Sequence, residues 1–316
     1  MKHFSLILAS SAVSVFISCL SCNQQKSPFT TAETEEKIVL LENDNPVFVY
    51  QKKPKSLTGQ YVCNNYIHPL FDLSGNVLTE EFPADHPYHR GVFWAWHQLY
   101  AGGRRLGDGW TNDSISQEVV STGIEKGKYY ARLKTDVLWR SIVSVYEKPF
   151  IEEKTTITVH KISDGIRRID FEIVLNALAD QLQIGGSADQ KGYGGFCVRM
   201  RLPDSLKFIS DIGPVTPQEL QIKAGPWMDF SGRFGAGPEI SGLTIICHPS
   251  MPGYPEPWIL RQKGSMQNVV FPGRDRIDVT RDKPVVLRYR LVIHNGGAAS
   301  LSIDGLIKEF SKLKVN

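Results

Sequence analysis

One short stretch, residues 85–97, gathers the side chains best suited to acid–base chemistry. Its thirteen residues include a carboxylate, three imidazoles, a guanidinium and two indoles: Asp85, His86, His89, His97, Arg90, Trp94 and Trp96. Imidazole titrates near neutral pH, so His86 and His89 are predicted to transfer protons, with Asp85 orienting one of them or acting itself. The alternative is a cluster of hydrogen-bonded structural histidines, although buried unpaired polar groups are costly to fold.

The residues around this stretch predict how it is presented. Pro83 and Pro87 restrict the backbone, which favours a rigid turn over a helix. From Val92 onward the composition is that of a buried strand. A polar loop that leads into a core strand is a common way to mount a functional site on a scaffold.

Strand alternation divides the two indoles from the rest of this strand. Trp94 and Trp96 share one face, and Phe93 and His97 share the other. Indoles stack well on sugar rings, so Trp96 is a candidate platform for a saccharide, with core packing as the alternative. His97 is either a buried hydrogen-bonded residue or part of a second wall of the site.

Five further residues are candidates because they lie where strands meet loops. His68 ends an apolar run and either joins His86 and His89 or caps a strand. Tyr193 follows a glycine-rich loop that lacks the GxGxxG and GK[ST] patterns of nucleotide loops. Arg199 and Arg90 are predicted to hold an acidic or hydroxylated substrate. His248 follows a core strand, and Trp258 is a second candidate for stacking on a sugar.

The histidines also permit a metal site. His68, His86 and His89, with His248 as a further ligand, are the alternative set for zinc or another divalent ion, although the His-Pro-x-His spacing is weakly specific. Apart from this divalent metal, no cofactor is predicted.

Alternating polar and apolar residues predict an all-β fold. The alternation is clear in residues 129–139, 150–160, 169–175 and 285–294, and only residues 300–313 have helical spacing. Long antiparallel strands joined by glycine- and proline-rich loops predict one large antiparallel β-sandwich with a short C-terminal helix over residues 37–316. His160 and His294 are predicted to face solvent.

The N-terminal residues predict export. Residues 1–22 have the pattern of a lipoprotein signal peptide, with Cys22 as the lipidated residue and Cys19 as the alternative. Residues 23–36 are polar and are predicted to be a linker. We expect a location in the cell envelope of a Gram-negative bacterium, lipid-anchored in the periplasm or outer membrane, or else secretion; membrane contact would occur through the lipid only.

Composition excludes several classes of protein. The chain has 36 Lys and Arg residues and 33 Asp and Glu residues, and no basic run is interleaved with aromatics, which argues against a nucleic-acid partner. After the predicted signal peptide, Cys63, Cys197 and Cys247 allow at most one disulfide, and the absence of a CxxC pair among these three argues against a thiolate zinc site.

Several segments together resemble one family: Tyr66-Ile67-His68-Pro69, Pro83-Ala84-Asp85-His86-Pro87-Tyr88-His89-Arg90-Gly91, Gly192-Tyr193-Gly194-Gly195, Cys247-His248-Pro249 and Pro257-Trp258. This combination resembles the PmoA-related ("methane oxygenase") family of exported bacterial proteins. The resemblance implies a galactose-mutarotase-like supersandwich. Methane oxygenase activity is not expected, because no spanning helix follows residue 22.

The preferred hypothesis is therefore an exported carbohydrate-active enzyme of the hydrolase, lyase or epimerase type, with a carbohydrate or another small molecule as its substrate. The alternatives are a non-catalytic glycan-binding lipoprotein and a metal-dependent enzyme that uses the histidine cluster.

Overall fold

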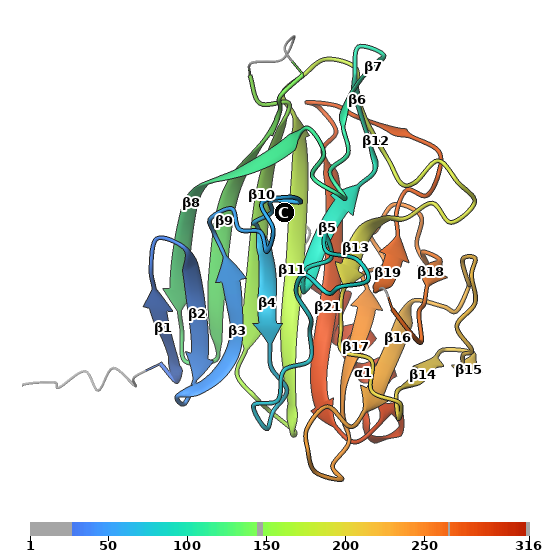
Figure 1. Cartoon of the computed structure of the whole chain (residues 1–316). Coiled ribbons are helices and arrows are strands. Elements are labelled where there is room, and N and C mark those ends of the chain that lie inside the picture. The colour runs from blue at the N-terminus through green and yellow to red at the C-terminus, as the bar shows by residue number, and fades with distance from the viewer. Residues whose placement is uncertain (1–26, 144–147, 265, 314–316) are drawn as a thin grey trace, which may run out of the picture.

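The structure is a computed structural model that describes residues 27–143, 148–264 and 266–313. Two large antiparallel sheets face each other, and a small third sheet lies at one end (Figure 1). The predicted large antiparallel β-sandwich with a short C-terminal helix is confirmed. The predicted signal peptide, including Cys19 and Cys22, lies outside the described residues.

The first sheet has eight strands and carries the segment that contains the histidines. Its order is β1-β2-β3-β4-β5-β13-β19-β18. The strands are β1 (Phe29–Glu33), β2 (Lys37–Glu42), β3 (Asn45–Gln51), β4 (Tyr66–Leu70), β5 (Val92–Trp96), β13 (Gly194–Val198), β19 (Gln267–Val270) and β18 (Trp258–Ile259).

The second sheet has nine strands, several of which are long and regularly alternating. Its order is β15-β14-β16-β17-β21-β11-β10-β9-β8. The strands are β15 (Gly213–Pro214), β14 (Lys207–Ser210), β16 (Trp227–Gly232), β17 (Ser241–Cys247), β21 (Val285–Asn295), β11 (Ile166–Ala177), β10 (Ile151–His160), β9 (Tyr130–Ser141) and β8 (Ile115–Lys126).

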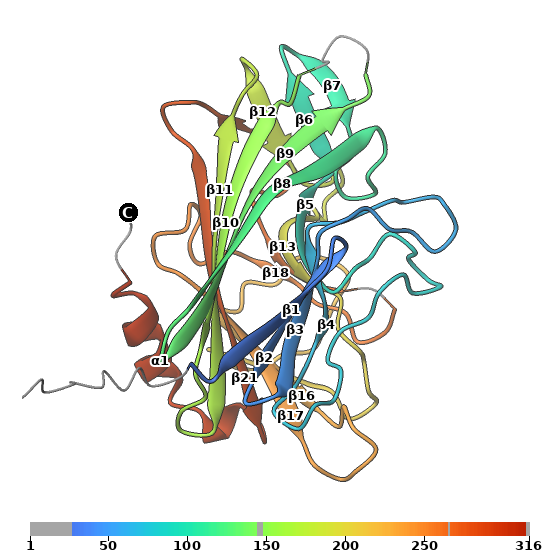
Figure 2. The same cartoon turned by 90° about the vertical axis from the view of Figure 1, so that its left-hand side faces the viewer.

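The remaining elements close one end and one outer face. The small sheet has the order β20-β12-β6-β7, formed by β20 (Ile277–Val279), β12 (Leu182–Gly185), β6 (Gln98–Ala101) and β7 (Arg104–Gly107). The short helix η1 (Ala298–Ser300) precedes α1 (Ile303–Phe310), which lies outside the nine-stranded sheet (Figure 2). No helix within the described residues is long and apolar enough to cross a membrane.

The apolar core lies between the two large sheets because alternate residues of their strands point inward. Trp94 and Trp96 of β5 point into this core, where Trp94 packs against Phe171 and Trp96 against Trp139. The opposite face of β5 carries Phe93, which belongs to a separate aromatic cluster on the outside of the eight-stranded sheet. The predicted division of this strand into two faces is confirmed.

Two expectations about exposed segments are wrong. Within the predicted linker 23–36, residues Phe29–Glu33 form β1, because their backbone groups pair with β2 as an edge strand. His294 was expected to face solvent but is buried against Asp229, with 2.8 Å between Nε2 and Oδ1. The cause is the C-terminal segment, which returns over this face and buries Val292 under Leu306 and Phe310.

Candidate functional site

The residues predicted to do chemistry lie on two consecutive tight turns before β5. The amide of His86 donates to the carbonyl of Pro83 at 3.1 Å, and the amide of His89 donates to the carbonyl of His86 at 2.9 Å. The amide of Phe82 donates to the carbonyl of His89 at 3.0 Å and closes the loop. The prolines thus hold the histidines on a rigid turn, as predicted.

A chain of charged hydrogen bonds fixes His86 in place. The Arg199 guanidinium donates to both carboxylate oxygens of Asp85, at 2.8 and 3.0 Å, and its Nε donates to Glu80 at 2.9 Å. Oδ2 of Asp85 lies 2.8 Å from Nδ1 of His86. Partial burial raises the pKa of Asp85, but the hydrogen bonds from Arg199 and His86 outweigh that effect and bring it to about 2.

This arrangement sets the tautomer of His86. Because the Asp85 carboxylate is ionised and only accepts hydrogen bonds, Nδ1 carries the proton and Nε2 of neutral His86 is the basic nitrogen. Nε2 has no hydrogen-bond partner among the described residues, and the side chain is 34% exposed. His86 can therefore accept a proton from a molecule bound beside it.

His89 lies behind His86 and does not share its exposure. The two imidazole rings stack in parallel with centroids 4.6 Å apart, and His89 is only 2% exposed. Burial, together with the charges of His86, Arg199 and Arg90, lowers the pKa of His89 to about 2. A permanently neutral imidazole of this kind supports the ring of His86 and is poorly suited to transfer protons.

His86 lines an open pocket of about 420 Å³. The other residues of its wall are Lys191, Tyr193, Pro217, Gln218, Glu219, Leu260, Arg261, Gln262 and Gly264. The pocket therefore collects an aromatic ring, two side-chain amides and two cations from three loops that are far apart in the sequence. Tyr193, which the sequence suggests as a substrate-binding residue, is part of this wall.

The sequence analysis missed Arg261 and Lys191. Arg261 donates to the Tyr193 hydroxyl and to the backbone carbonyls of Gln218, Leu260 and Glu219. Lys191 pairs with Glu219 at 3.2 Å. Neither residue stands in a recognisable motif, and only the folding of the two loops brings them to His86.

Two candidate residues belong to the aromatic cluster beneath the site. Arg90 is 1% exposed, and its Nη1 donates to the carbonyls of Tyr88 and Trp110. Nδ1 of His97 lies 2.8 Å from Asp108, and its ring stacks on Trp110 with centroids 5.0 Å apart. Both residues support the cluster, and neither lines the pocket beside His86.

Three residues predicted to bind substrate are placed elsewhere. Trp96 and Trp258 are fully buried, and their indole N–H groups donate to the carbonyls of Phe271 and Gly225. Neither indole has a free ring face for a sugar, because β5 and β18 direct these side chains into the core. His248 lies on the other sheet, where its ring meets Phe310 edge-on at 4.9 Å.

His68 and the proposed metal set are also not assembled. Nδ1 of His68 lies 2.9 Å from the Thr79 hydroxyl, and burial lowers the pKa of His68. The described residues contain no group of three or more His, Cys, Asp or Glu side chains placed to hold a metal ion. His68 therefore does not join His86 and His89 as a third ligand. The three cysteines of the described chain, Cys63, Cys197 and Cys247, are buried and free.

Comparisons with known proteins place the chain in a family. The model of the "Family of unknown function (DUF6807)" matches residues 37–308. The expected PmoA-related family is wrong, since the family model that matches is this one. No curated protein matches the sequence.

Among solved structures, the chain is similar to a "putative mutarotase (YeaD)" from Salmonella typhimurium. The TM-score is 0.31 and the sequence identity is 10%, over 85% of this chain and 94% of that one. At this level of similarity, no argument about function follows from the likeness.

Proposed function

The chain belongs to the DUF6807 family of unknown function, and we propose that it is an exported enzyme that moves a proton to or from a carbohydrate, with His86 as the catalytic acid–base residue. The observation that carries the proposal is the Asp85–His86 pair at the mouth of the 420 Å³ pocket. A carboxylate that fixes the imidazole tautomer, and a free Nε2 at a pocket, are the requirements for general acid–base catalysis.

The wall of the pocket supports a carbohydrate as the substrate. The Tyr193 ring lines the pocket and can contact a sugar ring, and the amides of Gln218 and Gln262 can both donate to and accept from hydroxyls. Arg261 and Lys191 supply positive charge that can stabilise an oxyanion formed when a proton leaves the substrate.

The carboxylates present favour the epimerase or lyase type of reaction over hydrolysis. Glycoside hydrolases usually place two carboxyl groups on either side of the bond they cleave. Among the described residues, Glu219 is the one carboxylate in the wall of this pocket, and it pairs with Lys191. A single imidazole base that takes up a proton and returns it fits epimerisation or elimination better.

Substitution of His86 tests the proposal. The purified protein is incubated with reducing sugars and with uronate oligosaccharides, and turnover is followed by polarimetry and by the ultraviolet absorbance of unsaturated products. His86→Ala should lower kcat/KM by about 10²- to 10⁴-fold with an unchanged circular dichroism spectrum. Lys37→Ala, at an exposed position on β2, is the control and should keep full activity.

Two outcomes reject the proposal. Equal turnover by the wild type and His86→Ala removes His86 from catalysis. Saturable binding of a glycan without turnover of any glycan that binds supports the non-catalytic alternative, a glycan-binding lipoprotein.

A further inference from the structure

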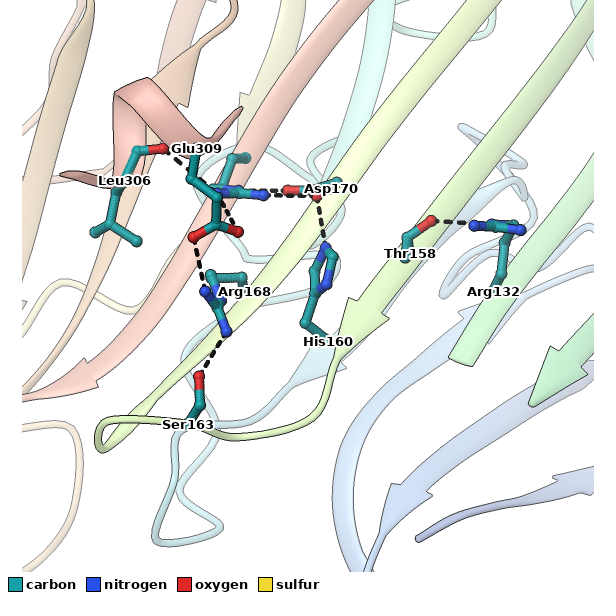
Figure 3. Close-up of polar contacts among 9 residues, drawn as sticks. Arg132, Thr158, His160, Ser163, Arg168, Asp170, Leu306 and Glu309 are labelled. Carbon is teal, nitrogen blue, oxygen red and sulfur yellow. Dashed lines mark hydrogen bonds and ion pairs between the residues drawn. The ribbon is translucent and has the colours of Figure 1, made fainter. Parts of the chain in front are cut away.

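A second pocket, of about 450 Å³, lies on the opposite side of the sandwich. It is formed by the outer face of the nine-stranded sheet, with α1 as one wall through Phe310. Figure 3 shows this face, where His160 points toward Asp170 and Arg132 toward Thr158. None of its residues takes part in the site around His86.

The register of four neighbouring strands arranges this face in two parallel rows. The first row crosses the neighbouring strands β9, β10, β11 and β21 at paired positions. In that order its residues are Arg132, Thr158, Asp170 and Arg290.

The second row repeats the pattern two residues along each strand. Lys134, Thr156, Glu172 and Arg288 follow one another in the same strand order. Each row therefore reads cation, hydroxyl, carboxylate, cation. All of these residues except the buried Arg290 line the pocket.

The carboxylates of both rows are held rigidly from one side. Arg290, which is fully buried, donates to both oxygens of Asp170 at 2.6 and 2.9 Å, and Arg288 donates to Glu172 at 2.8 Å. Burial raises the pKa of Asp170, but hydrogen bonds from Arg290 and His160 outweigh that effect and lower it below its usual value. The oxygens of both carboxyl groups are therefore fixed acceptors, and such groups bind the hydroxyls of a ligand without having to be ordered first.

His160 adds a further group to the pocket. Its Nε2 lies 2.7 Å from Asp170, which leaves Nδ1 without a hydrogen-bond partner among the described residues. The ring is about one quarter exposed and is held in one orientation by Asp170.

One cation of the two rows forms no ion pair with the described residues. Arg288 and Arg290 are neutralised by the carboxylates beside them, and Arg132 pairs with Glu125 at 3.0 Å. Lys134 makes no ion pair with any of the described residues. The pocket therefore combines hydroxyl-binding groups with one cation at its edge, Lys134, that is held in no ion pair among the described residues, although its charge also interacts with nearby Glu125.

We propose that this pocket binds one acidic unit of a saccharide, a hydroxylated ring with one carboxylate. The carboxylate of the ligand lies at Lys134, and the ring hydroxyls lie against Glu172, Asp170 and the two threonines. The proposal goes beyond the function proposed for His86, because it assigns a separate site that binds and does not catalyse.

Galacturonate and galactose are suitable probes because they share most of their hydroxyls and differ in the carboxylate. The ring-proton NMR signal of His160, assigned by its loss in His160→Gln, reports on this pocket alone. Galacturonate should shift the signal saturably, and galactose should shift it much more weakly. Galacturonate should cause the same shift in His86→Ala. The binding proposal can therefore fail or succeed independently of the catalytic proposal for His86.

Two lysines on the same outer face provide the matched comparison. Lys134→Ala should raise the Kd for galacturonate about 10-fold, the loss expected for one charge-assisted contact. Lys154 precedes Thr156 by two residues on β10 and pairs with Glu152 at 3.5 Å. Lys154→Ala removes the same charge as Lys134→Ala and should leave the Kd unchanged.

Three results overturn the proposal. The first is that galacturonate causes no saturable shift of the His160 signal. The second is that Lys154→Ala and Lys134→Ala weaken galacturonate binding equally. The third is acetate binding as tightly as galacturonate, because the pocket would then recognise the carboxylate and not the sugar.

Discussion

Acid should destabilise this protein through His89 at pH values where Asp85 is still ionised. His89 is 2% exposed, and burial with the neighbouring positive charges lowers its pKa from 6.5 to about 2. In the unfolded chain the same imidazole takes up a proton below about pH 6.5. The unfolded state therefore binds more protons than the folded state between pH 6.5 and 2, and stability falls as the pH falls through this range.

The size of the effect follows from the pKa difference. Each pH unit within the range costs about 1.36 kcal/mol per proton, so lowering the pH from about 6.5 to 4.5 should cost about 2.7 kcal/mol. Asp85, whose pKa is also lowered to about 2, contributes only below its ordinary value of 3.8. Above pH 4.5, Asp85 therefore does not contribute. Burial raises the pKa of Glu256 to about 7, so this carboxyl does titrate in the interval, with the opposite sign, but it remains in the His89 variant and cancels in the comparison below.

Urea unfolding at about pH 7.5 and pH 4.5 measures this cost in the wild type and in His89→Gln. Glutamine does not titrate, and any packing loss affects both pH values alike. The pKa values of His68 and His248 are also lowered by burial, but both residues remain in the variant and cancel in the comparison. The wild type should lose about 2–3 kcal/mol more than His89→Gln over this interval. Equal losses would refute the conclusion that His89 is neutral in the folded protein.

Two further substitutions separate catalysis from folding. Asp85→Asn should lower kcat about 100-fold or more, because an amide N–H facing Nδ1 favours the tautomer in which Nε2 of His86 is no longer basic. It should also lower stability, because the buried Arg199 loses the carboxylate to which it donates two hydrogen bonds. Steady-state kinetics and urea unfolding check the two effects separately, and full activity of the folded variant would contradict the first. Trp96→Ala should cost about 3–5 kcal/mol of unfolding free energy, because the indole is fully buried and donates to the Phe271 carbonyl. Thermal unfolding measures this cost. A change below about 1 kcal/mol would show that this side chain is not a core residue.

The turn before β5 was predictable because its signals are local. Pro83 and Pro87 restrict the backbone whatever surrounds them. After Val92, successive side chains of a strand must point to opposite faces, and the apolar residues at consecutive positions indicate that both faces are buried. The sequence therefore predicted the polar turn, the position of the strand and the separation of Trp96 from His97. It could not decide whether an indole that points to one face meets a ligand or the other sheet.

The composition of the site was not predictable, because it depends on contacts between distant segments. Arg199 reaches Asp85 across 114 residues of chain, and Arg261 reaches Tyr193 across 68. His86 and His89 stand three residues apart in one turn and look equivalent in the sequence. In the fold one lines a pocket and the other is sealed beneath it, and this burial lowers the pKa of His89 and separates the roles of the two residues.

The sequence by itself determined the all-β architecture, the C-terminal helix and the rigid turn, since hydrophobic periodicity and proline restrict the chain locally. Only the tertiary structure decided which side chains can act. It placed His86 beside a pocket, buried Trp96 and Trp258, and aligned two rows of charged residues across four strands. Burial, strand register and the approach of distant loops are properties of the packed chain, and they set the charge and accessibility on which chemistry depends.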